Sequence, residues 1–396
     1  MKKLITAMFI FVSCFTSKAF SDGHAIKMGI ILGFTGPIES LTPAMAASAE
    51  LAFKEASDSG KLLGGKSIMI ERADSTCVDS AAATTAAEGL VSNGVLAIMG
   101  ADCSGVTGAI ATNVAVPNGV VMISPSATSP GLTDLKDKGY FFRTAPSDAR
   151  GGQVLADITK DRKVKSIAVT HTNNDYGKGL ADVYVAAVKA HGISVTTVTA
   201  HEEGKGDYGA EVATLASAGG DALAVLGYLY QAGGSIIEGS LDSGSFDTFV
   251  LSDGMIGDSL TDRFGKDLNK SFGSLPGSTG KGAGKFAEVA KAGGIDSSGP
   301  YTGESYDAAA LITLAMQAGG KGDRATIQAN VMDVANAPGK KIYPGELGKA
   351  LDLLAKGKAV NYEGATGVEF TDVGEAFGSF LEKEIKGGKF KTKKQR

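Results

Sequence analysis

The sequence predicts an α/β fold with two Rossmann-like lobes. Strand-like and helix-like segments alternate almost without interruption, break off over residues 140–146, and then resume the same alternation. The chain has 396 residues, 43% hydrophobic and 21% charged, so it can bury a large core and is expected to form two domains. Its 55 glycines suit many short turns rather than disorder, because apolar runs recur throughout.

The first lobe is predicted from the segments before the break. One apolar face recurs at three-to-four spacing over residues 43–57, which is typical of a helix packed on a core. The expected strands of this half are 27–32, 67–71, 95–99 and 120–123, and the expected helices are 43–57 and 80–91.

The second lobe is predicted from the segments after the break. Its expected strands are 166–170, 195–198, 222–226 and 248–252, and its expected helices are 180–190, 210–217 and 234–241. No close sequence repeat relates the two halves, so the prediction of two similar units depends on the alternation alone.

Residues 1–21 have the pattern of a secretory signal peptide. A basic start precedes an apolar core over residues 4–12 and a small-x-small cleavage site at 19–21, with 17–19 as an alternative. Cys14 leaves a lipoprotein interpretation open, although the residues before it lack the usual leucine. The pattern predicts export to the periplasm.

The mature chain would begin near Asp22 as an acidic protein. Removing the three lysines of the leader changes the formal net charge from −4 to −7. Neither a nucleic-acid surface nor a membrane domain is indicated, and a monomer is expected.

Two neighbouring loops are the best candidates for a ligand site. The strand 95–99 leads into Gly-Ala-Asp-Cys-Ser-Gly, and a helix beginning at Ser104 would present unpaired N–H groups to an anion. The strand 120–123 leads into residues 124–128, which are rich in hydroxyl groups and restricted by a proline. Side by side, these loops would form a polar cradle for a small zwitterion.

Cys77 and Cys103 are the cysteines that remain after the leader is removed. Each follows a predicted strand, and an even pair in an oxidising compartment predicts a disulfide. The bond would close a loop of 26 residues, stabilise the fold by about 3 kcal/mol, and fix the backbone beside Ser104. Two buried free thiols are the alternative.

The enzyme motifs found in the sequence lack the strand and helix context that each of them requires. Residues 60–67 satisfy the P-loop pattern, but they follow a predicted helix and lead into a strand, the reverse of a working phosphate loop. Residues 280–284 lack the preceding strand that a dinucleotide site needs. The four histidines form neither a nucleophile-elbow pattern nor metal-chelating spacing. No catalytic residue, cofactor or metal is therefore predicted.

Several short motifs occur in a specific order. Together they resemble the leucine/isoleucine/valine-binding family of periplasmic solute receptors, the type I substrate-binding proteins of ABC importers. The matching pieces are Gly33-Phe34-Thr35-Gly36-Pro37, Cys77 and Cys103, Ser104, residues 124–128 and Asn174-Asp175-Tyr176-Gly177.

The resemblance implies a three-segment hinge between the lobes. The crossings are expected near 143–148, 272–276 and 360–364, and the basic end 386–396 is expected to be a solvated tail. The implied division is a signal peptide 1–21, a first lobe 22–145 and 275–360, and a second lobe 146–274 and 361–396.

The resemblance also implies an amino-acid site in the cleft between the lobes. From the first lobe, Ser104, Ser126 and Thr128 would hold the ligand carboxylate and part of its ammonium group. From the second lobe, Asp253 would complete the ammonium site. The aromatic residues expected around the ligand are Tyr176, Tyr301 and either Tyr228 or Tyr230.

Glu39 and Glu304 could also fall near the pocket. A buried unpaired carboxylate is costly, so each is expected to face solvent unless the ligand offers it a polar group. The predicted function is a receptor that delivers amino acids, with branched-chain ones as the leading case, to a membrane permease. The alternatives are an amino-acid sensor of the same fold and a small-molecule hydrolase.

Overall fold

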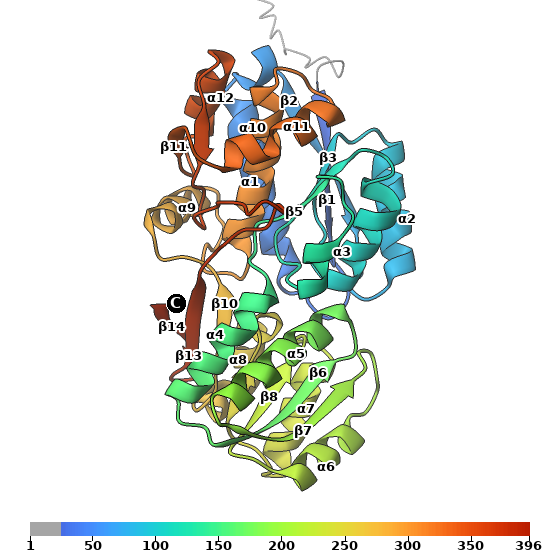
Figure 1. Cartoon of the computed structure of the whole chain (residues 1–396), viewed down its shortest axis with the longest axis vertical. Helices are drawn as coiled ribbons and strands as arrows, with labels where there is room; N and C mark the ends of the chain where they lie inside the picture. Colours follow the sequence, from blue (N-terminus) through green and yellow to red (C-terminus); the bar gives the residue numbers. More distant parts are fainter. Residues whose placement is uncertain (1–24) are drawn as a thin grey trace, which may run out of the picture.

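The computed structural model describes residues 25–396 as two α/β lobes, one above the other in Figure 1. The predicted signal peptide and Cys14 lie outside the described residues. Among the described residues, no helix combines the length and apolar character that a membrane span requires.

The first lobe is built on a parallel five-stranded sheet with the order β2-β1-β3-β4-β5. The four strands predicted for this lobe are present, each with ends within about three residues of the prediction. The fifth lies in the segment that the sequence marked only as a break. The strands are β1 (Ala25–Leu32), β2 (Ser67–Asp74), β3 (Ala97–Gly100), β4 (Val121–Ser124) and β5 (Phe141–Arg143).

Helices cover both faces of this sheet. α1, α10, α11 and α12 pack together on one side, and α2 and α3 pack on the other (Figure 1). α10 is buried along almost its whole length, because it lies between the sheet and the neighbouring helices. The helices are α1 (Thr42–Asp58), α2 (Ser80–Ser92), α3 (Ser104–Ile110), α9 (Lys281–Ala292), α10 (Thr302–Ala318), α11 (Arg324–Ala335) and α12 (Leu347–Ala355).

The second lobe repeats the same strand order. Its sheet runs β14-β13-β10-β9-β8-β6-β7, and β7-β6-β8-β9-β10 corresponds to β2-β1-β3-β4-β5 of the first lobe. This correspondence confirms the prediction of two units of one kind. The strands are β6 (Ser166–Thr172), β7 (Ser194–His201), β8 (Ala222–Leu226), β9 (Phe249–Leu251), β10 (Phe272–Pro276), β13 (Phe380–Ile385) and β14 (Phe390–Gln395).

The helices of the second lobe also pack on both faces of their sheet. α4 and α5 pair with each other, and α6 pairs with α7. The helices are α4 (Asp148–Asp161), α5 (Asp175–Ala190), α6 (Gly209–Ala218), α7 (Ala232–Asp242) and α8 (Asp258–Phe264).

The last crossing between the lobes lies later in the chain than the expected 360–364. β12 (Val360–Tyr362) pairs in parallel with β11 (Lys340–Ile342), and Tyr362 donates a hydrogen bond to Asp307 of α10, so this segment still belongs to the first lobe. The chain enters the second sheet only where β13 pairs with β10. The sequence indicated that residues 336–365 are irregular, but not that β12 pairs with β11.

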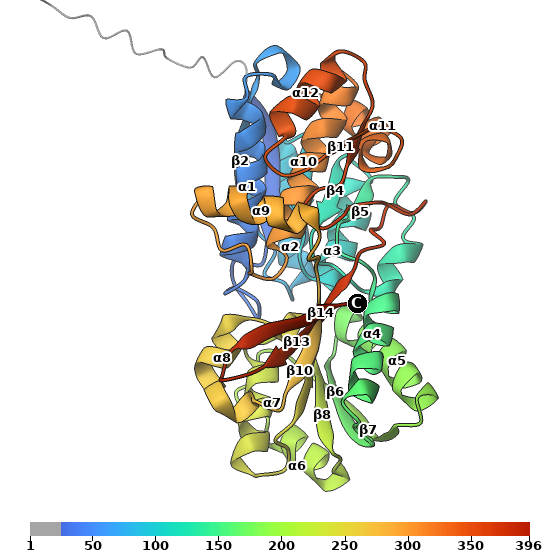
Figure 2. The ribbon, with the colours of Figure 1, turned by 90° about the vertical axis from the view of Figure 1, so that its left-hand side faces the viewer.

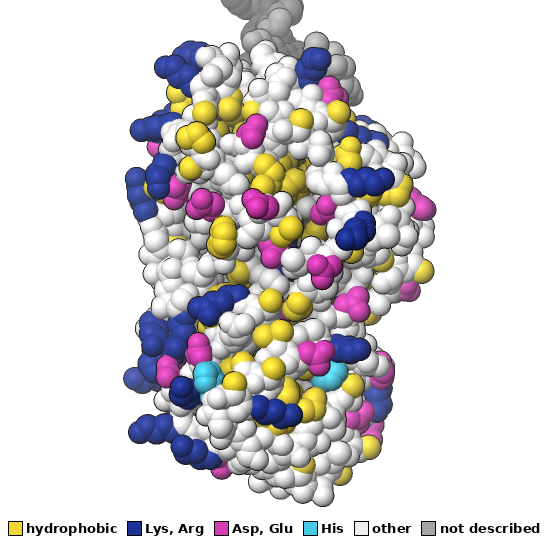
Figure 3. Space-filling model, in the orientation of Figure 1, with side chains coloured by type: hydrophobic (Ala, Val, Ile, Leu, Met, Phe, Trp, Pro, Cys, Tyr) yellow, Lys and Arg dark blue, Asp and Glu magenta, His cyan; other side chains and the backbone are white. Residues whose placement is uncertain are grey.

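The C-terminal segment is not the solvated tail that its basic composition predicted. β14 pairs antiparallel with β13 and forms the edge of the second sheet (Figure 2). Lysines on an edge strand discourage pairing with other chains, so they are compatible with a strand here. Figure 3 shows Lys and Arg side chains gathered on this side of the lobe.

The segment 60–67 is a turn, as its sequence context predicted. A short 3-10 helix, Leu62–Gly64, lies between the end of α1 and the start of β2. Its backbone N–H groups therefore do not converge at the beginning of a helix, as phosphate binding requires.

Candidate ligand-binding site

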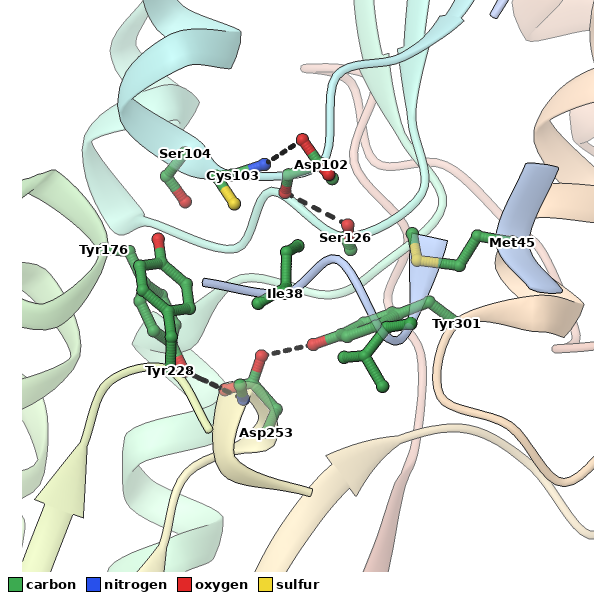
Figure 4. A pocket seen from close by; sticks show the side chains of 12 residues that line it. Ile38, Met45, Asp102, Cys103, Ser104, Ser126, Tyr176, Tyr228, Asp253 and Tyr301 are labelled. Carbon is green, nitrogen blue, oxygen red and sulfur yellow. Dashed lines mark hydrogen bonds between the residues drawn. The ribbon is translucent and has the colours of Figure 1, made fainter. Parts of the chain in front are cut away.

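A narrow cavity lies between the lobes, at the carboxyl ends of both sheets (Figure 4). The loops after β1 and β3 reach it from the first lobe, and those after β6 and β8 reach it from the second. These are the points at which the strand order of each sheet reverses, where open α/β sheets bind ligands. The lining residues are Ile38, Leu41, Met45, Asp102, Cys103, Ser104, Ser126, Tyr176, Tyr228, Asp253, Gly254 and Tyr301.

Ser104 and Ser126 bring hydroxyl groups to the first-lobe side of the cavity. Ser104 is the first residue of α3, and its Oγ accepts a hydrogen bond from the Ser129 N–H at 3.0 Å. Ser126 Oγ donates to the main-chain oxygen of Asp102 at 3.0 Å. Ser104 Oγ keeps its hydrogen free to donate, so this side of the cavity can hold a carboxylate, whereas the hydroxyl hydrogen of Ser126 is already donated to Asp102.

Asp102 orders the loop that carries these hydroxyls. Its carboxylate accepts hydrogen bonds from the Gly33 N–H at 2.6 Å, from Ser75 Oγ at 2.9 Å and from the Cys103 N–H at 3.0 Å. Burial raises the pKa of Asp102, and these three donors oppose that shift. Asp102 therefore joins the loops after β1, β2 and β3 into one rigid wall.

The predicted disulfide joins Cys77 and Cys103, whose Cα atoms lie 5.1 Å apart. It links the loop after β2 to the residue before Ser104, and Cys103 itself lines the cavity. The bond therefore fixes the backbone at the start of α3, as the sequence predicted.

Stacked tyrosines form the second-lobe wall. The rings of Tyr176 and Tyr228 are 5.2 Å apart and inclined by 22° (Figure 4). Asn174, which caps α5, donates to the Tyr228 hydroxyl at 3.3 Å. The sequence left Tyr228 and Tyr230 as alternatives. Tyr228 lines the cavity, whereas Tyr230 is 43% exposed.

Asp253 connects the two lobes. Its carboxylate accepts a hydrogen bond from the Tyr176 hydroxyl at 2.6 Å and another from the hydroxyl of Tyr301, which precedes α10 of the first lobe. Burial raises the pKa of Asp253, and the two tyrosine donors oppose that shift. A desolvated carboxylate held in this way is suited to a cationic group.

A second buried carboxylate, Asp148, lies close to Asp253 and was not predicted from the sequence. Asp148 begins α4 and is 3% exposed. Burial and the charge of Asp253 both raise the pKa of Asp148. The position of Asp148 beside Asp253 depends on the packing of α4 against the second sheet, so the sequence alone did not indicate it.

The apolar wall of the cavity was also missed. Ile38 and Leu41 come from the loop after β1, and Met45 comes from the first turns of α1. Apolar residues in a turn that follows a strand were the available signal, since such a turn would normally be polar.

The sequence profile of the family described as periplasmic binding protein matches residues 25–349. The chain belongs to the periplasmic binding protein family.

Relatives of this periplasmic binding protein include Leu/Ile/Val-binding protein homologs 3 and 1 of Brucella melitensis. Homolog 3 is 31% identical over 252 residues, which span 63% of this chain and 66% of the relative, just under two thirds of its length. Homolog 1 is 30% identical over 318 residues, 79% of this chain and 82% of the relative. A chemotactic signal transduction system substrate-binding protein of Halobacterium salinarum is 27% identical and covers 94% of this chain and 89% of its own length.

Solved structures share the fold. A leucine-binding protein from Thermotoga maritima superposes with a TM-score of 0.78 at 22% identity, covering 93% of this chain and 98% of its own. A branched-chain amino acid transporter substrate-binding protein from Streptococcus pneumoniae, in complex with isoleucine, superposes with a TM-score of 0.76 at 23% identity, covering 94% and 99%.

The family consists of solute-binding proteins rather than enzymes. This periplasmic binding protein is therefore a substrate-binding receptor, and the expectation that it is not an enzyme is confirmed. Family membership indicates a periplasmic or extracellular location. Within residues 25–396, no three or more His, Cys, Asp or Glu side chains gather where a metal ion could bind.

Three of the predicted site residues do not line the cavity, namely Glu39, Thr128 and Glu304. Glu39 is exposed in the loop after β1, which matches the solvent-facing alternative. Thr128 is 1% exposed, and its hydroxyl is buried near the Asp148 carboxylate without a hydrogen bond of normal geometry. Its main-chain oxygen accepts from the Asp148 N–H at 2.8 Å.

The expectation that Glu304 faces solvent is wrong. Glu304 is 4% exposed, because it lies in the first turn of α10, a helix that is buried along almost its whole length. Burial raises the pKa of Glu304 to about 8. Its side chain borders a different hollow from the one between Tyr176 and Tyr301.

Proposed function

We propose that this receptor captures amino acids, with branched-chain ones as the leading case, and delivers them to the permease of an ABC importer. The observation that carries the proposal is the cavity itself. Hydroxyl groups of the first lobe lie opposite a buried carboxylate of the second lobe, and apolar side chains stand between them. The leader pattern of residues 1–21 would export the chain to the periplasm, where it would act as a monomer.

Ser104 and Ser126 would bind the ligand carboxylate from the first lobe. Both line the cavity: Ser104 Oγ has a hydrogen free to donate to an anion, and Ser126 Oγ would donate to it on turning away from the main-chain oxygen of Asp102. Thr128 belongs to the same loop but lies outside the cavity, so we propose that it supports this loop beside Asp148 rather than contacting the ligand carboxylate.

Asp253 would bind the ligand ammonium group from the second lobe. The carboxylate is 8% exposed, so pairing with a cation offsets the cost of its burial. Tyr176 and Tyr301 already orient both of its oxygens, and Tyr228 would pack against the ligand from the side.

The ligand side chain would contact Ile38, Leu41 and Met45. A branched aliphatic group buries apolar area there and leaves no polar group unpaired. A charged side chain in the same place would lose its hydration without a partner. This difference supports the branched-chain preference.

Binding would couple to delivery through closure. The ligand's two charged ends contact different lobes, so only the closed, liganded form presents both lobes to the permease as one surface. The energy for import would come from an ATPase on another chain.

The test uses Asp253→Asn and a matched control, Asp242→Asn, at an exposed position of the same lobe. We expect a thermal-shift screen to show stabilisation of the parent by leucine, isoleucine or valine, because a ligand of the folded state raises its melting temperature. Calorimetry should show at least about tenfold weaker binding for Asp253→Asn and unchanged binding for the control. Equal affinity of both variants would remove Asp253 from the site, and no stabilisation by any amino acid would reject the function.

A sensory role is the second candidate. The substrate-binding protein of the Halobacterium chemotaxis system covers most of this chain, and a sensor would use the same cleft. Deleting the gene and measuring uptake of labelled leucine alongside chemotaxis towards leucine separates the roles. Lost uptake supports transport, whereas lost chemotaxis with intact uptake supports sensing.

A further inference from the structure

A second and wider hollow lies beside the hinge. α9 and the start of α10 border it from the first lobe, and β10 and the β13–β14 hairpin border it from the second. Figure 2 shows this side of the molecule, with α9 above the hairpin. Of the residues that line the cleft cavity, Tyr301 alone also lines this hollow.

The first-lobe wall of the hollow carries an unpartnered acid. Glu304 is 4% exposed, and no other described residue donates a hydrogen bond to its carboxylate. Asp307, one turn further along α10, accepts hydrogen bonds from Tyr362 and Thr366. Its negative charge raises the pKa of Glu304 further and gives that carboxyl no partner. In the ligand-free protein burial raises the pKa of Glu304 to about 8, and a cationic partner in the hollow would offset the cost of ionising this carboxyl.

The second-lobe wall carries an unpaired base. Lys383 of β13 is half-buried, and its Nζ donates to Thr392 Oγ1 of β14 at 3.0 Å. It forms no ion pair with any residue from 25 to 396, and burial lowers the pKa of its ammonium group while the charge of Asp258 opposes that shift. Lys383 and Glu304 face the same hollow without pairing with each other.

We propose that the hollow beside the hinge is a second ligand site for a small zwitterion, whose ammonium group pairs with Glu304 and whose carboxylate pairs with Lys383. Serine and threonine hydroxyls lie along the wall between these charges and can bond to either end of such a ligand. The ligand satisfies both unpaired groups at once, which neither a simple amine nor a simple acid can do. Because its two ends contact different lobes, it also bridges the hinge.

The probe is 5-aminopentanoate, whose charges are separated by a flexible chain and which lacks the α-amino acid group expected in the cleft. Calorimetry on the mature chain should show binding at millimolar concentrations. Backbone NMR should show shifted amides in residues 297–304 and 381–392. Pentanoate and pentylamine, each lacking one charge, should bind at least about tenfold more weakly.

Variants test which residues bind the probe. Glu304→Gln and Lys383→Met should each weaken binding of the probe at least about tenfold, since each removes one charged partner. Lys386→Met, at an exposed position of the same hairpin, should leave it unchanged. Asp253→Asn should also leave it unchanged, which separates this site from the cleft whatever the cleft binds.

Three outcomes overturn the proposal. The first is the absence of binding and of amide shifts at millimolar probe. The second is equal binding by parent and Glu304→Gln. The third is binding of pentylamine as tight as that of the probe, which leaves Lys383 without a role. Lys383→Met keeps the test decisive if Glu304→Gln does not fold.

Discussion

Tyr228 and Tyr230 are two positions apart in one loop, yet one lines the cleft and the other faces solvent. Tyr228 is 4% exposed and stacks on Tyr176, while Tyr230 is 43% exposed. The Tyr230 N–H donates to the main-chain oxygen of Pro37 on the opposite lobe at 3.2 Å, which fixes the loop in this orientation. Because the side chains are chemically identical, the sequence could not distinguish them.

Tyr228→Ala should weaken amino-acid binding about tenfold, because it removes a packed aromatic wall. Tyr230→Ala should change the affinity by less than about twofold, as expected away from the buried centre of a contact surface. Calorimetry measures both, and the melting temperature of each ligand-free variant shows that it is folded. Similar losses from both variants would contradict the assignment.

Glu304→Gln should raise the melting temperature, and more so at alkaline pH. Burial raises the pKa of Glu304 from an ordinary value of 4.5 to about 8. Between these values the folded protein keeps a proton that the unfolded chain has lost, so the parent becomes less stable as the pH rises through this window. Glutamine does not titrate and removes the loss.

Differential scanning calorimetry of ligand-free protein at about pH 5 and pH 8.5 tests this effect, since these values span the titration. The advantage of Glu304→Gln over the parent should grow between them. Glu39→Gln, at an exposed site, should show no such growth. A constant difference would show that Glu304 does not titrate in this window.

At the scale of elements, the sequence missed β5 and β14 for the same reason. Both contain charged residues, which disfavoured a strand by composition, and in each an arginine in or next to the strand is held by an acidic partner that the local pattern does not indicate. Arg143 of β5 is 1% exposed and donates to Thr133 and Glu375, and to the main-chain oxygen of Ser129 at 2.8 Å. Arg396, which follows β14, pairs with the fully buried Glu382.

Removing residues 387–396 should lower the melting temperature by several degrees. The truncation removes β14 with its hydrogen bonds to β13, and it leaves the buried Glu382 with Arg162 in place of the two arginines that hold it in the parent. Lys391→Gln, an exposed change in the same strand, should alter the free energy of unfolding by no more than about 0.5 kcal/mol. Circular dichroism on heating measures both, and an unchanged melting temperature after truncation would restore the interpretation as a solvated tail.

At the scale of the whole molecule, the described arrangement is a closed one. Besides the contacts of Asp253, Ser129 Oγ donates to the main-chain oxygen of Asp175 across the cleft at 3.0 Å. Gly179 of α5 also faces the first lobe, where an added Cβ would come within 2.8 Å of Pro130 Cδ. A side chain at position 179 therefore meets the opposite lobe only on closure.

Gly179→Ala should weaken ligand binding without destabilising the ligand-free protein. Alanine favours a helix over glycine by about 1 kcal/mol, so the open form loses nothing, while the new methyl group opposes closure. Gly89→Ala in α2, where an added Cβ meets nothing within 4 Å, is the matched control and should bind as the parent does. Calorimetry and melting temperature test the pair, and parental affinity of Gly179→Ala would show that closure tolerates the contact.

The sequence by itself determined the fold class, the two similar lobes, the disulfide and most of the polar residues around the cleft. These features depend on local patterns: periodicity sets the elements, and residues that follow strands of parallel sheets must lie at one edge. The tertiary structure alone decided which tyrosine lines the cleft, that Glu304 is buried, and that β5 and β14 exist. The tyrosine and Glu304 depend on how distant segments and the two lobes pack together, and the two strands depend on which neighbouring strand each joins in a sheet. The local sequence pattern determines neither.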